Sequence, residues 1–396
     1  MILRRTVFFL GLSQLVCWGT AYYLIGGFGQ VIGDDLGWSR DLVYGGFSLA
    51  LLVMGFASPL AGRLIDRHGG RRVMATGSVL IALGCAGVAL SHGVVLYYAS
   101  WIVLGFAMRL TLYDAAFATL ARIGGPSARK PMAQVTLFGG LASTVFWPFG
   151  HMLTEYFGWR AALFVYAGIA LLTLPLHLAI PLSRYGEAVE AATPAPPLLE
   201  ERPPLALSRR DRFAAGTLYA LITAAVNFLN SGMSAHMINI LAGLGLAATA
   251  AVWISTLRGI AQSAARLGEV LFGSRLDAFH LNMLAAALLP FAFIAGMAGG
   301  VFVPAALAFA FVYGAGNGLT TITRGTLPLA LFDRSTYGLV VGRLLMPSFI
   351  VSAASPLVYA GVIERFGSRA ALVLSAAVAL LALAAAIVLH LRFRER

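Results

Sequence analysis

Long apolar stretches dominate the sequence and limit what it can fold into. A helix needs about 20 mostly apolar residues to cross the hydrocarbon core of a bilayer. Twelve stretches meet this requirement: 7–32, 42–65, 73–91, 94–121, 131–154, 160–182, 213–240, 247–272, 282–300, 303–332, 338–362 and 370–391. Only 11% of the 396 residues are charged, whereas soluble domains have roughly 25%. The sequence therefore predicts an all-α integral membrane protein with twelve transmembrane helices.

The distribution of charge and cysteine excludes several other classes of protein. The net charge of +12 is spread over the segments between the apolar stretches, so we expect the lipid bilayer as a partner and no nucleic acid. Cys17 and Cys85 lie inside apolar stretches without metal-ligand spacing. The sequence has no Gly-rich phosphate loop, no H-E-x-x-H and no Gly-x-Ser-x-Gly. We therefore expect no metal, no cofactor and no enzymatic activity.

Basic residues predict the orientation of the chain. With the N-terminus in the cytoplasm, four of the 28 basic residues fall in outer loops (Arg40, Arg160, Arg365 and Arg369), five lie within helices, and the other 19 (28 − 4 − 5) are cytoplasmic. Cytoplasmic loops of membrane proteins carry such an excess of Lys and Arg. We therefore expect a multi-pass protein of a bacterial inner (plasma) membrane with both termini in the cytoplasm.

A polar segment divides the chain into two halves. Residues 183–212 include five prolines and lack helical periodicity, which is typical of a linker. We expect an N-terminal six-helix bundle at 1–182, a cytoplasmic linker at 183–212 and a C-terminal six-helix bundle at 213–396.

The two halves also repeat each other. Residues 155–163 (EYFGWRAAL) match residues 364–372 (ERFGSRAAL) at an offset of 209, and the same offset relates Gly105 to Gly314. Duplicated halves around a linker are typical of transporters, which bind their substrate between the halves near the membrane midplane.

A motif follows the second apolar stretch. Residues 62–72 read GRLIDRHGGRR, and a degenerate copy, residues 273–277 (GSRLD), follows the eighth stretch. The chain thereby resembles the major facilitator superfamily, whose members carry G-x-x-x-D-R-x-G-x-R between helices 2 and 3. The resemblance implies the major facilitator fold of two pseudo-symmetric six-helix bundles, and a gating role for the motif. The motif residues are Gly62, Asp66, Arg67, Gly69, Arg71, Arg72 and, in the second copy, Asp277.

Within that superfamily the chain resembles the branch of monocarboxylate transporters and oxalate–formate antiporters. The residues that carry this resemblance are 36–40 (LGWSR), 129–133 (RKPMA) and 158–160 (GWR). Two positions depart from related carriers. Trp101 stands where many drug and sugar carriers have an arginine, and Gln262 stands where proton-coupled members have an aspartate, four residues before Arg266.

Five arginines lie inside the apolar stretches, but only two acids do. They are Arg109, Arg258, Arg266, Arg324 and Arg343, with Asp114 and Glu269. A charge at bilayer depth costs roughly 2.5–3.5 kcal/mol, so each needs a partner or a function. Three positive charges (5 − 2) stay unpaired, which favours an anionic substrate. A guanidinium also binds a carboxylate through two hydrogen bonds. For Arg343, near a helix end, we expect a side chain that extends to the membrane surface.

The stretch 247–272 contains four polar residues on one helical face. Arg258, Gln262, Arg266 and Glu269 share this stripe, which must face protein or water. One interpretation is substrate contact by the arginines and Gln262, with Glu269 as a gate or proton site. The alternative is a structural pair between Arg266 and Glu269 at i and i+3.

Asp114, Glu269 and His151 are the candidates for proton coupling. Asp114 lies five residues after Arg109, and Arg324 is one position from the repeat equivalent of Asp114. Asp114 either exchanges a proton as a cationic partner departs, or forms a permanent bridge to Arg109 or Arg324. For His151, simple packing is the alternative.

Polar and aromatic stripes predict a wet cavity between the halves. Gln14, Trp18 and Tyr22 follow i, i+4 and i+8, and Asn227, Asn230 and Ser234 follow i, i+3 and i+7. Ordinary hydrogen bonding between helices is the alternative. The candidate substrate-binding residues are therefore Arg258, Arg266, Gln262, Arg109, Tyr22, Trp18, Gln14, Asn227, Asn230 and Arg324.

These features together predict a secondary transporter that works by alternating access. We expect its substrate to be a small organic anion, a monocarboxylate or dicarboxylate, moved by proton symport or by anion exchange, and we expect a monomer. The first alternative is an exporter of drugs or toxic compounds, and the second is a membrane sensor or enzyme.

Overall fold

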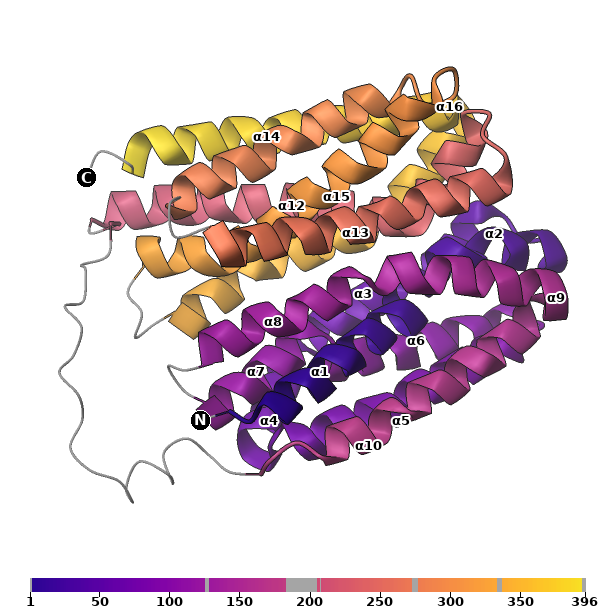
Figure 1. Ribbon diagram of the computed structural model, residues 1–396, viewed down its shortest axis with the longest axis horizontal. Coiled ribbons are helices and arrows are strands. Elements are labelled where there is room, and N and C mark those ends of the chain that lie inside the picture. Colours follow the sequence, from indigo (N-terminus) through magenta and orange to yellow (C-terminus); the bar gives the residue numbers. More distant parts are fainter. Residues whose placement is uncertain are drawn as a thin grey trace.

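The computed structural model describes residues 2–124, 128–182, 205–206, 208–272, 277–332 and 337–393. All regular elements in these ranges are helices, and they run roughly along the long axis of the molecule (Figure 1). Most of the predicted linker lies outside the described residues. The next helix begins earlier than expected, at Arg209, because Ser208 caps it by accepting a hydrogen bond from the amide of Asp211.

The elements fall into two groups along the chain. The N-terminal half contains α1 (Arg4–Cys17), η1 (Trp18–Tyr22), α2 (Leu24–Leu36), α3 (Arg40–Phe56), α4 (Ser58–His68), α5 (Gly70–Ala89), α6 (Val94–Thr111), α7 (Tyr113–Gly124), α8 (Arg129–Gly140), α9 (Ala142–Leu171) and α10 (Thr173–Leu178). The C-terminal half contains α12 (Arg209–Gly243), α13 (Ala248–Phe272), α14 (Ala278–Gly296), α15 (Val303–Leu331) and α16 (Tyr337–Phe393).

Twelve membrane-length helices account for the described part of the chain. Length and composition alone select eight stretches that can cross a membrane. Two of these, Gln134–Leu178 and Pro347–Phe393, each contain a glycine at which one helix ends and the next begins. The α3–α4 pair and α13 complete the set (8 + 2 + 2); α13 is less apolar because it carries Arg258, Gln262 and Arg266.

The two halves lie side by side as separate bundles, with both ends of the chain at the same end of the molecule (Figure 1). The internal repeat is visible in the backbone. Gly158 and Gly367, 209 residues apart, have φ values of 78° and 80°, a region open to glycine and costly for other residues. Gly105 and Gly314 both pack against backbone: an added Cβ would lie 2.6 Å from the carbonyl oxygen of Ala50 and 2.2 Å from that of Arg258.

Two of the predicted helices are interrupted where they approach the space between the halves. The first contains a π-helical turn, Trp18–Tyr22, between α1 and α2. The fourth breaks at Leu112, which has an extended conformation. The sequence predicted continuous helices at both places, and neither contains proline. The boundaries of the other helices differ from the predicted ones by a few residues.

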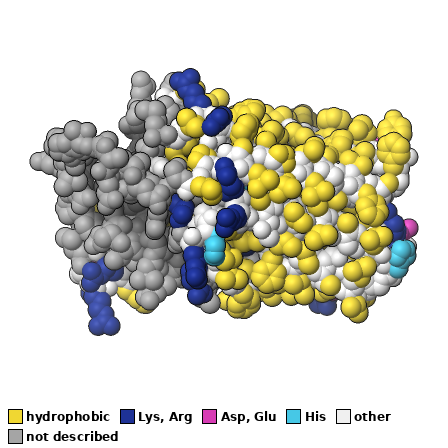
Figure 2. Space-filling view, turned by 90° about the horizontal axis from the view of Figure 1, so that it is seen from below, with side chains coloured by type: hydrophobic (Ala, Val, Ile, Leu, Met, Phe, Trp, Pro, Cys, Tyr) yellow, Lys and Arg dark blue, Asp and Glu magenta, His cyan; other side chains and the backbone are white. Residues whose placement is uncertain are grey.

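The surface has the apolar side chains expected of a membrane protein. On the face shown in Figure 2, hydrophobic side chains form a broad band, and most of the visible Lys and Arg side chains gather along one edge of it. Exposed arginines near the helix ends at this side include Arg4, Arg5, Arg63, Arg67, Arg72, Arg209, Arg210 and Arg212. The helix ends that carry them are those at which the chain termini also lie.

Candidate functional site

A cavity of about 330 Å³ lies between the two halves. Its lining residues on α12 (219–230) lie around the middle of that helix, whereas those on α15 (317–327) come late and those on α16 (345–352) come early. The cavity therefore lies in the part of the bundle nearer to the chain termini.

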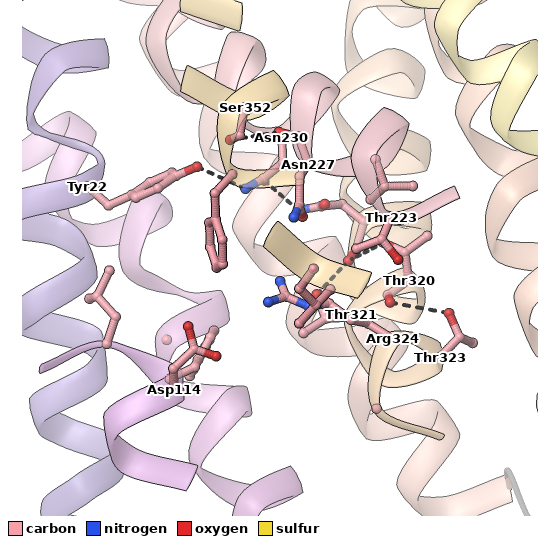
Figure 3. Close-up of a pocket in the computed structure, with 18 of the residues that line it drawn as sticks. Tyr22, Asp114, Thr223, Asn227, Asn230, Thr320, Thr321, Thr323, Arg324 and Ser352 are labelled. Atoms are coloured by element: carbon pink, nitrogen blue, oxygen red, sulfur yellow. Dashed lines mark hydrogen bonds between the residues drawn. The ribbon is translucent and has the colours of Figure 1, made fainter. Parts of the chain in front are cut away.

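The C-terminal half supplies a polar wall. Arg324, Thr321, Asn227 and Asn230 project from α15 and α12 into this space (Figure 3). We call this surface the polar wall; its members are Thr223, Asn227, Asn230, Gln262, Arg266, Asn317, Thr320, Thr321, Arg324 and Ser352. Of these, Thr223, Asn317, Thr320, Thr321 and Ser352 were not predicted from the sequence.

The N-terminal half supplies an apolar and aromatic wall. Tyr22, Trp18, Tyr113 and Phe117 form a chain of rings with successive centroid distances of 4.7, 4.9 and 5.6 Å. We call this surface the aromatic wall; it also includes Tyr23, Leu51, Met54, Met108 and Leu112. The π-helical turn contributes to it, because a π-turn inserts an extra residue and so brings Trp18, Tyr22 and Tyr23 to the cavity together.

Gln14 was predicted to share the cavity with Trp18 and Tyr22, but the structure places it elsewhere. Its side chain is fully buried, and its Nε2 donates a hydrogen bond of 2.7 Å to the carbonyl of Thr111. The break of the fourth helix at Leu112 explains this position. The Ala115 amide donates its hydrogen bond to the Leu112 carbonyl instead of the Thr111 carbonyl. The Thr111 carbonyl is therefore available to accept a hydrogen bond from Gln14.

Arg324 lies on the polar wall with its guanidinium directed into the space between the halves (Figure 3). Its carbonyl accepts a hydrogen bond of 2.8 Å from the Tyr219 hydroxyl. No described residue forms a hydrogen bond or ion pair with its guanidinium. The predicted bridge between Arg324 and Asp114 is not formed, although Arg324 acts electrostatically on that carboxylate.

Arg266 is also on the polar wall and is almost fully buried. Its guanidinium reaches across to the N-terminal half, donating to the Tyr113 hydroxyl at 3.2 Å and to the Thr136 carbonyl at 2.5 Å. It also donates to Thr321 at 3.0 Å. No carboxylate is among these partners, so the positive charge of Arg266 is not neutralised. The alternative pair with Glu269 is not formed.

Arg258 lies deeper between the halves than the cavity and does not line it. Its side chain is fully buried, and it donates hydrogen bonds to Asn230 at 2.6 Å and Ser234 at 3.0 Å. Its guanidinium carbon lies 5.4, 5.9 and 5.2 Å from the ring centroids of Tyr23, Trp147 and Tyr313. Its Nε and Nη1 atoms have no described hydrogen-bond partner.

Asn230 connects this buried arginine to the cavity. Its Oδ1 accepts hydrogen bonds from Arg258 and, at 3.1 Å, from Asn317, and its Nδ2 donates to the Tyr22 hydroxyl at 3.3 Å. The side-chain Nδ2 of Asn227 donates a hydrogen bond of 3.1 Å to the Ser348 hydroxyl. The polar stripe of α12 thus serves both the cavity and the contacts between helices.

Asp114 and Arg109 form an ion pair beside the cavity. Asp114 lines the cavity with 43% of its side chain exposed, whereas Arg109 is 13% exposed and lies behind it, 5.6 Å from the ring of Phe349. The predicted bridge to Arg109 is therefore present in this state. Because Arg109 already neutralises Asp114, the two arginines of the polar wall leave the cavity positively charged.

The other proton-coupling candidates are not brought to the cavity. His151 lies 3.3 Å from Glu155 near the end of the fifth helix. Glu269 is half-buried, and no described residue is within ion-pair distance of it. The Arg343 side chain lies outside the described residues.

The motif residues lie away from the cavity, at the end of the bundle that carries the termini. Gly69 has φ 76°, and Arg71 donates to the Ile180 carbonyl at 2.7 Å. Gly62 is half-buried, Arg67 and Arg72 are exposed, and the Asp66 side chain lies outside the described residues, so their gating role stays a prediction. Of the second copy, Gly273 and Arg275 also lie outside the described residues.

Asp277 of that second copy caps α14. Its carboxylate accepts hydrogen bonds of 2.7 Å from the His280 amide and 2.9 Å from its ring. Although partial burial opposes the effect, these hydrogen bonds hold the pKa of the Asp277 carboxyl below its ordinary value.

The halves contact each other closely at the end of the molecule far from the termini. Tyr44 of α3 accepts a hydrogen bond of 2.6 Å from Asn239 of α12, and its ring lies 4.0 Å from that of His236. These contacts, with the cage around Arg258, close the described structure beyond the cavity.

Comparisons with known proteins agree with this architecture. The sequence matches the profile of the Major Facilitator Superfamily over residues 10–254. It is 35% identical to human Monocarboxylate transporter 11 over 185 residues, which are 45% of this chain and 37% of that protein. For the mouse protein of the same name the values are 30% over 187 residues, 45% and 39%. The alignments thus span well under half the length of these curated relatives. They confirm the resemblance to monocarboxylate transporters expected from the sequence.

Solved structures with the same fold have little sequence identity to the chain. The crystal structure of a point mutant of the nucleoside transporter NupG superposes with a TM-score of 0.75 at 14% identity, covering 97% of this chain and 98% of that one. Another crystal structure of NupG gives a TM-score of 0.68 at 14% identity, covering 98% and 99%. At this identity the likeness shows the fold alone.

Proposed function

The chain belongs to the Major Facilitator Superfamily, and from this we propose that it is a secondary transporter for a small organic anion, a monocarboxylate or dicarboxylate. The observation that carries the proposal is the charge of the cavity. Two arginines, Arg266 and Arg324, stand on the polar wall without a carboxylate partner, while Asp114 is already paired with Arg109. Surplus fixed positive charge in a cavity of low dielectric attracts an anion.

The two arginines differ in how they would serve the anion. The Arg324 guanidinium has no described partner and is free to bind a carboxylate through two parallel hydrogen bonds. Arg266 keeps hydrogen bonds to both halves and would add an attractive charge. The names of the curated relatives, which are monocarboxylate transporters, support a carboxylate as the substrate.

The closed end of the molecule supports the proposal of alternating access. The contacts of Tyr44 with Asn239 and His236, and those of Arg258 with Tyr23 and Trp147, join the two halves beyond the cavity. We propose that these contacts separate when the cavity is presented to the opposite side. Binding of the anion neutralises the polar wall and so favours the halves coming together around it.

Asp114 offers a route for proton coupling. Its carboxylate faces the cavity, and its attraction to Arg109 and Arg324 depends on its charge. Protonation of Asp114 would weaken the ion pair with Arg109 and leave one more positive charge to attract the anion. A proton and an anion would then move together, whereas without protonation the same site supports anion exchange.

The proposed setting is a bacterial inner membrane, with both termini in the cytoplasm and the protein working as a monomer. Reporter fusions at the C-terminus and after Pro204 test the orientation. A reporter signal from the outer side at either position would overturn it.

A melting experiment tests the choice of substrate class. Purified protein in detergent is titrated with L-lactate and succinate and, as a cationic drug, with tetraphenylphosphonium, because a ligand that binds the folded state raises its melting temperature. We expect the carboxylates to stabilise the wild type and the exposed-arginine control Arg212→Gln, but not Arg324→Gln. Stabilisation by tetraphenylphosphonium alone would replace the anion carrier with the exporter.

A further inference from the structure

The two walls of the cavity contain equivalent positions of opposite polarity. The offset of 209 relates Trp18 to Asn227, Met108 to Asn317 and Leu112 to Thr321. All six residues line the cavity. In each pair the N-terminal half has an apolar or aromatic side chain and the C-terminal half has an amide or a hydroxyl. At these three pairs of positions the cavity is therefore amphipathic across the plane between the halves.

The apolar side of this cavity is a specific surface made of rings. Trp18, Tyr113 and Phe117 are in ring contact one after another, with Tyr113 and Phe117 stacked at an interplanar angle of 13°. A flat ring on such a surface gains stacking as well as burial. A small acid such as lactate has only a methyl group, and no ring, to place there.

The volume agrees with a ligand that has both parts. Pockets for drug-sized ligands measure roughly 300–1,000 Å³, and the cavity of about 330 Å³ is at the lower limit of that range. It accommodates one ring with a short acid chain, whereas a three-carbon acid alone would leave much of it to water.

We propose that the substrate is an aromatic carboxylate, with its ring on the aromatic wall and its carboxylate on Arg324. The inference rests on the proposed anion transport and narrows it. Gln262, whose Oε1 has no described partner, is placed on the polar wall to accept a hydrogen bond from a hydroxyl near the carboxylate. The N-terminal half then makes few directional contacts with the substrate and can move past it as access alternates.

Four probes separate the contributions of ring and charge. They are L-3-phenyllactate, its cyclohexyl analogue, L-lactate, and 3-phenylpropane-1,2-diol, in which the carboxylate is replaced by an alcohol. Dissociation constants are measured for the wild type, Trp18→Leu, Phe117→Leu and the control Trp253→Leu, whose ring is 60% exposed on the outer surface. Melting curves establish that each variant is folded, and two aromatic-wall variants keep the test valid if one of them is not.

We expect phenyllactate to bind at least tenfold more tightly than lactate and roughly two- to tenfold more tightly than the cyclohexyl acid. Trp18→Leu or Phe117→Leu should abolish the difference between phenyl and cyclohexyl, while Trp253→Leu keeps it. Equal binding of phenyllactate and lactate would overturn the aromatic substrate and leave anion transport standing. Equal binding of phenyllactate and the diol would overturn both, because the carboxylate would then contribute nothing.

Discussion

Arg258 and Arg266 lie on the same face of α13, about 12 Å apart along the helix axis, yet their surroundings differ. Around Arg258, three aromatic rings and two hydrogen bonds enclose the guanidinium away from the cavity. The Arg266 guanidinium instead lies on the wall of the cavity that Asp114 and Arg324 also line. We call these the closed level and the cavity level.

A shared helical face therefore does not imply a shared role. At the closed level, Arg258 of the C-terminal half contacts Tyr23 and Trp147 of the N-terminal half, so its charge helps to hold the two halves together. The cavity level contains an acid, Asp114, and two arginines without a carboxylate partner, and all three line the cavity. We therefore expect changes at the closed level to alter stability and conformation, and changes at the cavity level to alter binding and coupling.

The largest effect is expected at Asp114, the acid of the cavity level. Asp114→Asn cannot exchange a proton, so uptake driven by a pH gradient into proteoliposomes should be abolished while exchange of anions across the membrane continues. Asp34→Asn, an exposed acid at the far end of the first helix, is the matched control. Loss of both activities with a lower melting temperature would indicate a purely structural bridge, and undiminished pH-driven uptake would remove the proton role.

Arg266 is next in expected size. Arg266→Gln removes the charge and should weaken anion binding by roughly a hundredfold. Arg266→Lys keeps a charge but loses the planar fork that holds it at the cavity wall through Tyr113, Thr136 and Thr321, and should weaken binding by roughly tenfold. Titration calorimetry in detergent measures both, with Arg212→Gln as the control. Wild-type affinity in the two Arg266 variants would transfer the binding role to Arg324 alone.

At the closed level the same substitution should behave differently. Arg258→Lys cannot keep both hydrogen bonds of the guanidinium, and we expect it to destabilise the protein by about 1.5–3 kcal/mol while changing anion affinity less than threefold. Melting curves and titrations on the same samples give the two quantities. An affinity loss equal to that of Arg266→Lys would cancel the distinction between the two levels.

Much of the fold could be predicted because it depends on features that are spread over many residues. Apolar stretches, arginine placement and the repeat at 209 each involve long segments, and the twelve helices and two halves follow from them. The sequence also selected Trp18, Tyr22, Asn227, Asn230, Gln262, Arg266 and Arg324, all of which line the cavity.

The rest of the site depends on local backbone changes that leave no pattern in the sequence. The break at Leu112 contains neither glycine nor proline, yet it brings Tyr113 to the cavity and Gln14 to the Thr111 carbonyl. A stripe on one helical face does not show how deep in the bundle each residue lies, so the stripe grouped Arg258 with Arg266. One missed residue was within reach: the offset of 209 from Gln14, a predicted cavity residue, leads directly to Thr223, which lines the cavity.

The smallest effect is expected at Asp277, which lies outside both levels and provides a baseline for them. As the N-cap of α14 it accepts a hydrogen bond from the His280 amide. Asp277→Ala should therefore lower stability by about 1 kcal/mol, whereas Asp277→Asn, which keeps an acceptor, should cost less.

The stabilising effect of the Asp277 charge should also depend on pH, because the folded-state pKa of this carboxyl is lowered. The contribution of the charge to stability is complete above the unfolded pKa of about 3.9 and is lost as pH falls through the folded pKa. Melting curves from pH 7 down to about pH 3.5 should therefore show the wild type approaching Asp277→Asn at the acid end. Anion affinity at pH 7 should be equal in all three proteins, and a tenfold loss in either variant would place Asp277 in the transport cycle instead of the cap.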